Sequence, residues 1–195
     1  MLMNKSEKYG VTSEHLLRMV HELETFVEDI HSISVVCDND IIFSKCIPPY
    51  TEESMQMLHS FSKSMNSIAV GIAISEGKLK LDDLVVDHFR EYLPEKYDRR
   101  IDQLTVRNLL TMAANSCRLS TCFRGVTSSW ITHYFTYELP HDPGTVFQYD
   151  TGASYMLSSL VSKTMHKNVL ELMKERVFGP MEITDVEWLE SPEGN

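Results

Sequence analysis

Ser60-Phe61-Ser62-Lys63 opens an apolar stretch of this chain and decides how the rest of it is interpreted. Residues three positions apart lie on one face of a helix, so the tetrad brings the Ser60 hydroxyl beside the Lys63 amine. An amine that burial keeps uncharged can take the proton of a serine and turn it into a nucleophile. The tetrad therefore predicts a nucleophilic serine with its own base, an arrangement suited to acyl transfer.

The residues after Ser60 distinguish this tetrad from a chance match, which a chain of this size contains about once. The apolar residues that follow at helical spacing are Phe61, Met65, Ile68, Ala69, Ile72 and Ala73. Val70 and Ile74 fill the opposite side, so we expect a helix that is buried nearly all round. At its N-terminus, free N–H groups and the helix dipole favour a negatively charged serine oxygen.

A second tetrad, Ser75-Glu76-Gly77-Lys78, has the same spacing but the wrong surroundings. Gly77 indicates the end of the helix, where the dipole opposes an alkoxide. For Ser60 an alternative stays open, because serine is a preferred N-cap residue. In that interpretation Ser60 only caps the helix and Lys63 is a solvated neighbour.

Composition narrows the possible partners and location of the protein. The chain has 195 residues, enough for one domain or slightly more, and a net charge of −10, which argues against nucleic acid and anionic membranes as partners. The polar first ten residues do not resemble a secretory signal, and no run suits a membrane span, so we expect a cytoplasmic protein. The four cysteines match no zinc pattern and are predicted to be free thiols. No metal and no other cofactor is predicted.

Hydrophobic periodicity predicts a mixed α/β chain with more helix than strand. Helices are expected over 11–30, after Ser60, and over 105–114, 128–137, 152–165 and 168–177. Strands are expected over 32–37 and 41–45, joined as a hairpin, with a possible third over 183–189. Residues 115–127 are small and polar, which is typical of a loop.

Four segments, in this order, resemble the serine beta-lactamase and penicillin-binding-protein superfamily, and most of all its class C-like carboxylesterase branch. They are Leu-His-Ser-Phe-Ser-Lys-Ser-Met at 58–65, Glu-Gly-Lys-Leu-Lys-Leu-Asp-Asp at 76–83, Leu-Thr-Val-Arg-Asn-Leu-Leu-Thr-Met at 104–112 and Pro-Gly-Thr-Val-Phe-Gln-Tyr at 143–149. The resemblance implies that residues 1–195 form one partial domain, with an N-terminal helix and hairpin beside a mostly helical part.

The second catalytic motif of that family is Tyr-x-Asn, and here it reads Tyr149-Asp150-Thr151. The resemblance implies that Tyr149 exchanges protons with Lys63. A phenol beside an ammonium group can lose its proton below its free pKa and then act as a base. The alternative is a structural tyrosine whose hydroxyl bonds a neighbour.

Thr151 departs from the family pattern and bears on the substrate. The resemblance implies a substrate-binding role at this position, but threonine offers one hydroxyl where asparagine offers both a donor and an acceptor. This difference favours simple esters over beta-lactams and peptides. In the alternative interpretation Thr151 caps the helix that follows, and Asp150 is expected to be an exposed carboxylate at the helix start.

The third family motif, Lys-Thr-Gly or His-x-Gly on a late strand, is not found after Thr151. In the family that strand supplies one donor of the oxyanion hole, and the other is the amide of the nucleophile, here Ser60. The late strands of the sheet are therefore expected to be missing, and the hairpin to present an unpaired edge. A second chain that supplies those strands is a possible partner.

Two functions follow from these observations. The first is a serine hydrolase that acts on a small ester or amide through an acyl-enzyme on Ser60, with Lys63 and Tyr149 as proton-transfer groups. The second is a truncated, non-catalytic remnant, or one subunit of a split hydrolase, that keeps the pocket without turnover.

Overall fold

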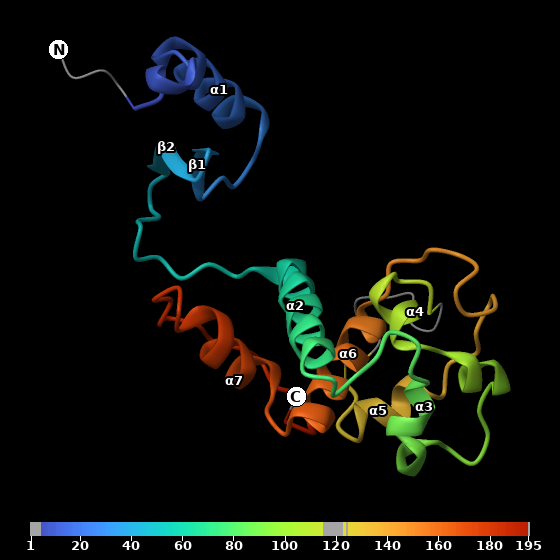
Figure 1. Ribbon diagram of the computed structural model, residues 1–195. Coiled ribbons are helices and arrows are strands. Elements are labelled where there is room, and N and C mark those ends of the chain that lie inside the picture. Colours follow the sequence, from blue (N-terminus) through green and yellow to red (C-terminus); the bar gives the residue numbers. More distant parts are fainter. Residues whose placement is uncertain (1–4, 115–122, 124, 195) are drawn as a thin grey trace. The chain divides into compact units, whose positions relative to one another are not determined.

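The computed structural model describes residues 5–114, 123 and 125–194, and these fall into two compact units, Met1–Met57 and Leu58–Asn195. Figure 1 shows both units. Cys117 and Cys122 lie outside the described residues, whereas Cys37 and Cys46 are free cysteines. No helix within the described ranges is both long and apolar enough to cross a membrane.

The first unit is a short 3-10 turn (η1, Glu7–Tyr9), a helix (α1, Ser13–Phe26) and an antiparallel hairpin (β1, Ser32–Cys37; β2, Asp40–Cys46). The Thr12 hydroxyl caps α1 by accepting from the amide of His15. The predicted turn of the hairpin is confirmed, and Asp38 and Asn39 take left-handed backbone conformations there, which these residue types tolerate best after glycine.

Three polar contacts fasten the start of the chain and α1 to the hairpin. The Tyr9 hydroxyl donates to Asp40 over 2.5 Å, and Lys5 pairs with the same carboxylate at 3.3 Å. Lys45 of β2 pairs with Glu24 of α1 at 2.5 Å. These contacts are exposed or half-buried, so each contributes little, and together they keep a marginal two-stranded sheet against its helix.

The second unit contains most of the helices, and its elements are as follows in chain order. They are η2 (His59–Phe61), α2 (Ser62–Ser75), α3 (Val85–His88), η3 (Arg90–Tyr92), η4 (Arg99–Gln103), α4 (Val106–Leu110), α5 (Trp130–Tyr134), α6 (Thr151–Met165), α7 (Val169–Met173) and a π-helical turn, η5 (Lys174–Phe178). The predicted helices are therefore present, although several are shorter than their periodicity indicated.

The core of the second unit forms where α2 packs against α6 and α7, as Figure 1 shows. Fully buried residues on these helices include Ala69, Val70, Ala73, Met156, Leu160 and Leu172. Small residues on α2 let the longer side chains of α6 and α7 approach closely. This packing brings the N-terminal turns of α2 and α6 together.

Two predictions about secondary structure and burial are wrong. Residues 183–189 form no strand and pair with no described strand; Leu189 is 92% exposed. The helix after Ser60 is not buried nearly all round, since Ile68 is 42% exposed and its neighbour Ser67 is exposed as well. The apolar composition of α2 therefore predicted more burial than this helix has.

Candidate active site

Ser60 lies in the 3-10 turn η2, immediately before α2. His59 has a φ of 46°, in the left-handed region that few residues other than glycine occupy. The Ser62 hydroxyl donates to the His59 carbonyl over 2.7 Å and stabilises this bend. The bend leaves Ser60 exposed at the start of the helix.

The segment that carries Tyr149 is held by backbone hydrogen bonds to the residues after α4. The amide of Gln148 donates to the Met112 carbonyl over 2.8 Å, and that of Gly144 donates to the Ala113 carbonyl over 2.8 Å. Met112 itself has a left-handed φ of 53°. Gly144 at the start of this segment and Gln148 next to Tyr149 are thereby anchored to the backbone that follows α4.

The backbone at residue 144, which donates to the Ala113 carbonyl, requires a glycine. Its φ is 84°, and a Cβ atom there would lie 2.9 Å from Nδ2 of Asn108. Asn108 is held in place by the capping box of α4, in which its side chain and that of Thr105 bond each other's backbone amides. The close approach therefore fixes the segment from residue 144 to Tyr149 against α4.

Asp150 caps α6 by accepting from the amide of Ala153 over 2.9 Å. It is fully buried, which corrects the expectation of an exposed carboxylate at this position. The expected alternative role of Thr151 as the cap is also wrong, because Asp150 takes it and Thr151 is the first residue of α6. A buried cap sets the direction in which the chain enters α6 and hence the position of Tyr149 beside it.

The structure brings Ser60, Lys63 and Tyr149 together. The Tyr149 hydroxyl lies 2.7 Å from Ser60 Oγ, and Lys63 Nζ lies 3.2 Å from the same oxygen. Lys63 Nζ also lies 5.1 Å from the centre of the Tyr149 ring. One serine oxygen therefore has a phenol and an amine within hydrogen-bonding distance.

The environment of Tyr149 lowers the pKa of its phenol. Its hydrogen bond with Ser60, and then the nearby Lys63 ammonium, hold the phenol pKa below the ordinary value of 10.0, while partial burial opposes them. The reason is that both neighbours can donate to a phenolate oxygen, which stabilises its charge. Tyr149 remains 46% exposed and Lys63 is half-buried, so the amine is less buried than the sequence argument assumed.

Two helix N-termini meet at this site. Ser60 directly precedes the first turn of α2, and Tyr149 directly precedes the cap of α6. Unpaired amide groups and aligned peptide dipoles give both ends a partial positive charge. The arrangement can stabilise a serine alkoxide or a phenolate between them.

Thr151 and Asn66 lie beside these three residues on the two helices. The Thr151 hydroxyl is buried and has no hydrogen-bond partner among the described residues, so its substrate-binding role stays a prediction. Asn66, one turn after Lys63, was not singled out from the sequence. The sequence does indicate Asn66, because its polar side chain interrupts an apolar helix on the side that carries Lys63.

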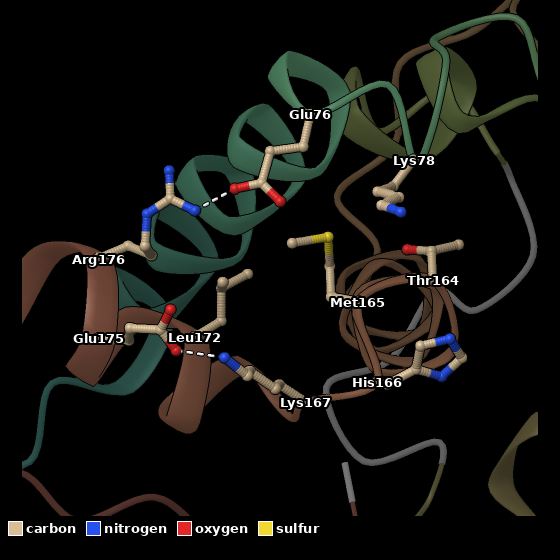
Figure 2. Close-up of a pocket in the computed structure, with 9 residues that line it drawn as sticks. All are labelled: Glu76, Lys78, Thr164, Met165, His166, Lys167, Leu172, Glu175 and Arg176. Carbon is tan, nitrogen blue, oxygen red and sulfur yellow. Dashed lines mark hydrogen bonds and ion pairs between the residues drawn. The ribbon is translucent and has the colours of Figure 1, made fainter.

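A separate polar cavity of about 180 Å³ lies at the other ends of α2 and α6. Figure 2 shows Arg176 paired with Glu76 and Lys167 paired with Glu175 at this cavity, which Lys78 also lines. The C-terminal ends of α2 and α6 carry partial negative charge, which disfavours the binding of an anion in this cavity. The two ion pairs also neutralise the charges of Arg176 and Lys167. None of the predicted site residues lines this cavity.

Known proteins resemble this chain in sequence. A "Beta-lactamase" of Escherichia coli (strain K12) is 25% identical over 145 residues, which cover 74% of this chain and 37% of that protein. A "Beta-lactamase" of Pseudomonas fluorescens is 26% identical over 130 residues, which cover 66% of this chain and 35% of that protein. The chain thus spans little more than a third of the curated relatives that it matches.

Solved structures resemble its fold. A Bacteroides dorei DSM 17855 protein assigned as a beta-lactamase superposes with a TM-score of 0.73 at 18% identity, covering 87% of this chain and 52% of that one. A D-stereospecific amidohydrolase from Streptomyces sp. superposes with a TM-score of 0.61 at 14% identity, covering 72% of this chain and 46% of that one. The mixed α/β architecture is therefore that of part of the beta-lactamase fold.

The sequence model of the beta-lactamase family matches residues 24–195, most of the chain and all of the helical unit. That match agrees with the fold and with the meeting of Ser60, Lys63 and Tyr149. This chain belongs to the beta-lactamase family.

Proposed function

We propose that this chain carries the nucleophile of a serine hydrolase that acts on an ester or amide through an acyl-enzyme on Ser60. The observation that supports it most is the 2.7 Å contact between Tyr149 and Ser60, with Lys63 3.2 Å from the same oxygen. Kinship with the beta-lactamase family supports the same reaction class.

In the first half of the proposed reaction, the Tyr149 phenolate takes the Ser60 proton, and Lys63 stabilises the negative charge. The Ser60 oxygen bonds to the substrate carbonyl carbon, and the carbonyl π electrons move to its oxygen. When they return, the bond to the leaving group breaks, and Tyr149 gives its proton to that group. The product is an acyl-enzyme and a released alcohol or amine.

In the second half, water takes the place of the leaving group. Tyr149 accepts a proton from the water while the water oxygen attacks the acyl carbon. The bond to Ser60 Oγ then breaks, and the serine regains its proton from Tyr149. The acid is released and the starting protonation state returns, so no oxidant, metal or cofactor enters the reaction.

The surroundings of Ser60 bear on the kind of substrate. Phe61 follows it directly and is exposed, and Phe147, two residues before Tyr149, is 71% exposed. Aromatic side chains on both segments of the site favour esters with an apolar group. Thr151, in place of the family's asparagine, also favours esters over amides, because it lacks an amide fork to hold a substrate N–H and C=O.

A second candidate is a non-catalytic remnant, or a subunit of a split hydrolase that needs further polypeptide. It is favoured by one observation: the described residues hold only a two-stranded sheet. Losing one oxyanion donor typically lowers the rate by about 10²–10³. We propose that a second chain supplying strands is the partner in this case.

Reaction with a fluorophosphonate probe separates the two candidates. We expect the intact mass to show one covalent adduct, which peptide analysis maps to Ser60. This adduct should disappear in Ser60→Ala and be strongly reduced in Lys63→Ala. Ser75→Ala, in the other tetrad, is the matched control and should label like the unchanged chain. An adduct that survives Ser60→Ala contradicts the proposal, and a cooperatively folded chain that takes no label supports the non-catalytic candidate.

A further inference from the structure

Asn66 is a buried polar residue in the middle of the apolar part of α2. It is 7% exposed, and its neighbours on the helix, Ala69 and Val70, are completely buried. Its Nδ2 donates to the Ser154 carbonyl over 3.0 Å and to Ser154 Oγ at 3.1 Å. Both acceptors belong to α6, so this one side chain links the two helices that frame the site.

The orientation of the Asn66 amide follows from its partners. A rotated amide would place Oδ1 against the Ser154 carbonyl oxygen, and two acceptors repel each other. In the observed orientation Oδ1 is buried and has no partner among the described residues. An asparagine with one satisfied end is costly in a helix interior, and an apolar residue would pack there at lower cost. The link therefore calls for a role other than stability.

The position of the link points to that role. Asn66 follows Lys63 by three residues, and Ser154 follows Thr151 by three residues, so both lie one helical turn from the site. The contact of Tyr149 with Ser60 lies just before the N-terminal ends of the same two helices. The Asn66–Ser154 bonds fix the spacing of α2 and α6 one turn below the reacting groups.

We propose that Asn66 is a positioning residue that holds Tyr149 within hydrogen-bonding distance of Ser60 by tying the first turns of α2 and α6 together. It touches neither the substrate nor the reacting oxygen. The inference takes its meaning from the proposed function, because the contact that it maintains is the proposed proton-transfer pair. A shift of the order of 1 Å between such groups can lower a rate by about 10²-fold.

The test measures the geometry and the reactivity separately, in three variants of the whole chain. Asn66→Leu removes the link and keeps the branched shape of the side chain, and Ser154→Ala removes only one of its two acceptors. Val161→Ala creates a small cavity further along α6, at a residue that is fully buried and remote from the site. The phenol pKa of Tyr149 is followed by NMR with 13C-labelled tyrosine, its signal assigned with Tyr149→Phe, and Ser60 labelling is timed with the fluorophosphonate probe.

Expected in Asn66→Leu is a rise of the Tyr149 pKa toward its ordinary value and labelling that is at least about tenfold slower, at unchanged cooperative unfolding. Ser154→Ala should move both quantities in the same direction by less. Val161→Ala should lower the melting temperature and leave the pKa unchanged, which separates positioning from simple destabilisation. If Asn66→Leu does not fold, Ser154→Ala decides the question.

The inference is overturned if the pKa of Tyr149 is the same in Asn66→Leu as in the unchanged chain. Where only Ser154→Ala folds, an unchanged pKa of Tyr149 in that variant overturns it. The proposed function fails by a different result. If the unchanged chain takes no label but its Tyr149 pKa still rises in Asn66→Leu, the positioning role stands and the hydrolase does not. If Ser60 is labelled and the pKa does not move, the hydrolase stands and the positioning role does not.

Discussion

The Tyr149 hydroxyl donates to Ser60 Oγ over 2.7 Å, although 89 positions separate the two residues in sequence. Tyr149→Phe removes the hydroxyl and keeps the ring, so the fold should be retained. We expect Ser60 labelling by the fluorophosphonate to fall by about 10²–10⁴, the usual contribution of a general base. Tyr92→Phe, which removes a phenol from a tyrosine packed against the core elsewhere, is the control. Equal labelling of the two variants would exclude Tyr149 as the base.

The rate of Ser60 labelling should depend on pH through the Tyr149 phenol. Because the base form is the reactive one, the rate rises as pH increases through the phenol pKa, which Ser60 and Lys63 hold below 10.0. Lys63→Met removes the nearby positive charge with little change in length, so the inflection of the rate profile should move to higher pH. A profile with the same inflection in both proteins would show that Lys63 does not act on this phenol.

Gly144→Ala should destabilise the chain and disturb the site. Alanine at a φ of 84° is strained, and its Cβ would lie 2.9 Å from Asn108 Nδ2. Gly77→Ala is a matched control, because Gly77 has a φ of 70° but no atom within 4 Å of an added Cβ. We expect a loss of about 1 kcal/mol of unfolding free energy for Gly77→Ala and a larger loss for Gly144→Ala, measured by urea unfolding. Equal losses would mean that the Asn108 contact has no energetic weight.

Asp98 should make the unfolding free energy depend on pH in the acid range. It accepts hydrogen bonds from Arg100 and from the amide of Leu139, and the Arg100 contact above all lowers its pKa to about 2 from 3.8. A depressed carboxyl pKa stabilises the folded state above the unfolded value, so the contribution is complete above about pH 4 and is lost as pH falls toward 2. The full contribution of Asp98 to the unfolding free energy is at most about 2 kcal/mol, because solvent screens its interaction with Arg100.

The check for Asp98 is urea unfolding between pH 2 and pH 6. Asp98→Asn should lower the unfolding free energy at pH 6 and flatten the acid decline. Asp87→Asn is a suitable control, since Asp87 is exposed and pairs with Arg90 at the surface. If the unfolding free energies of Asp98→Asn and Asp87→Asn fall equally as the pH is lowered, Asp98 is not the cause of the acid dependence.

Local patterns were enough to predict the helix before the hairpin, the hairpin and the helix after Ser60. Their side-chain periods and turn residues act over a few neighbours, which is the range that a sequence displays. The strand expected over 183–189 is not formed, because a strand needs another strand to pair with and no described strand pairs with these residues. The short helix α3 was missed for a related reason, since four residues are too few to show a period.

By itself, the sequence determined the hairpin, most of the longer helices and the placing of Ser60 beside Lys63, which spacing within one helix already fixes. Tyr149 was predicted from the order of the family's motifs along the chain. The meeting of Tyr149 with that pair, the burial of Asp150 and the Asn66 link to Ser154 were decided only by tertiary structure. Each depends on α2 packing against α6, two segments about 90 residues apart, and such packing is settled by the fit of many buried side chains rather than by any local pattern.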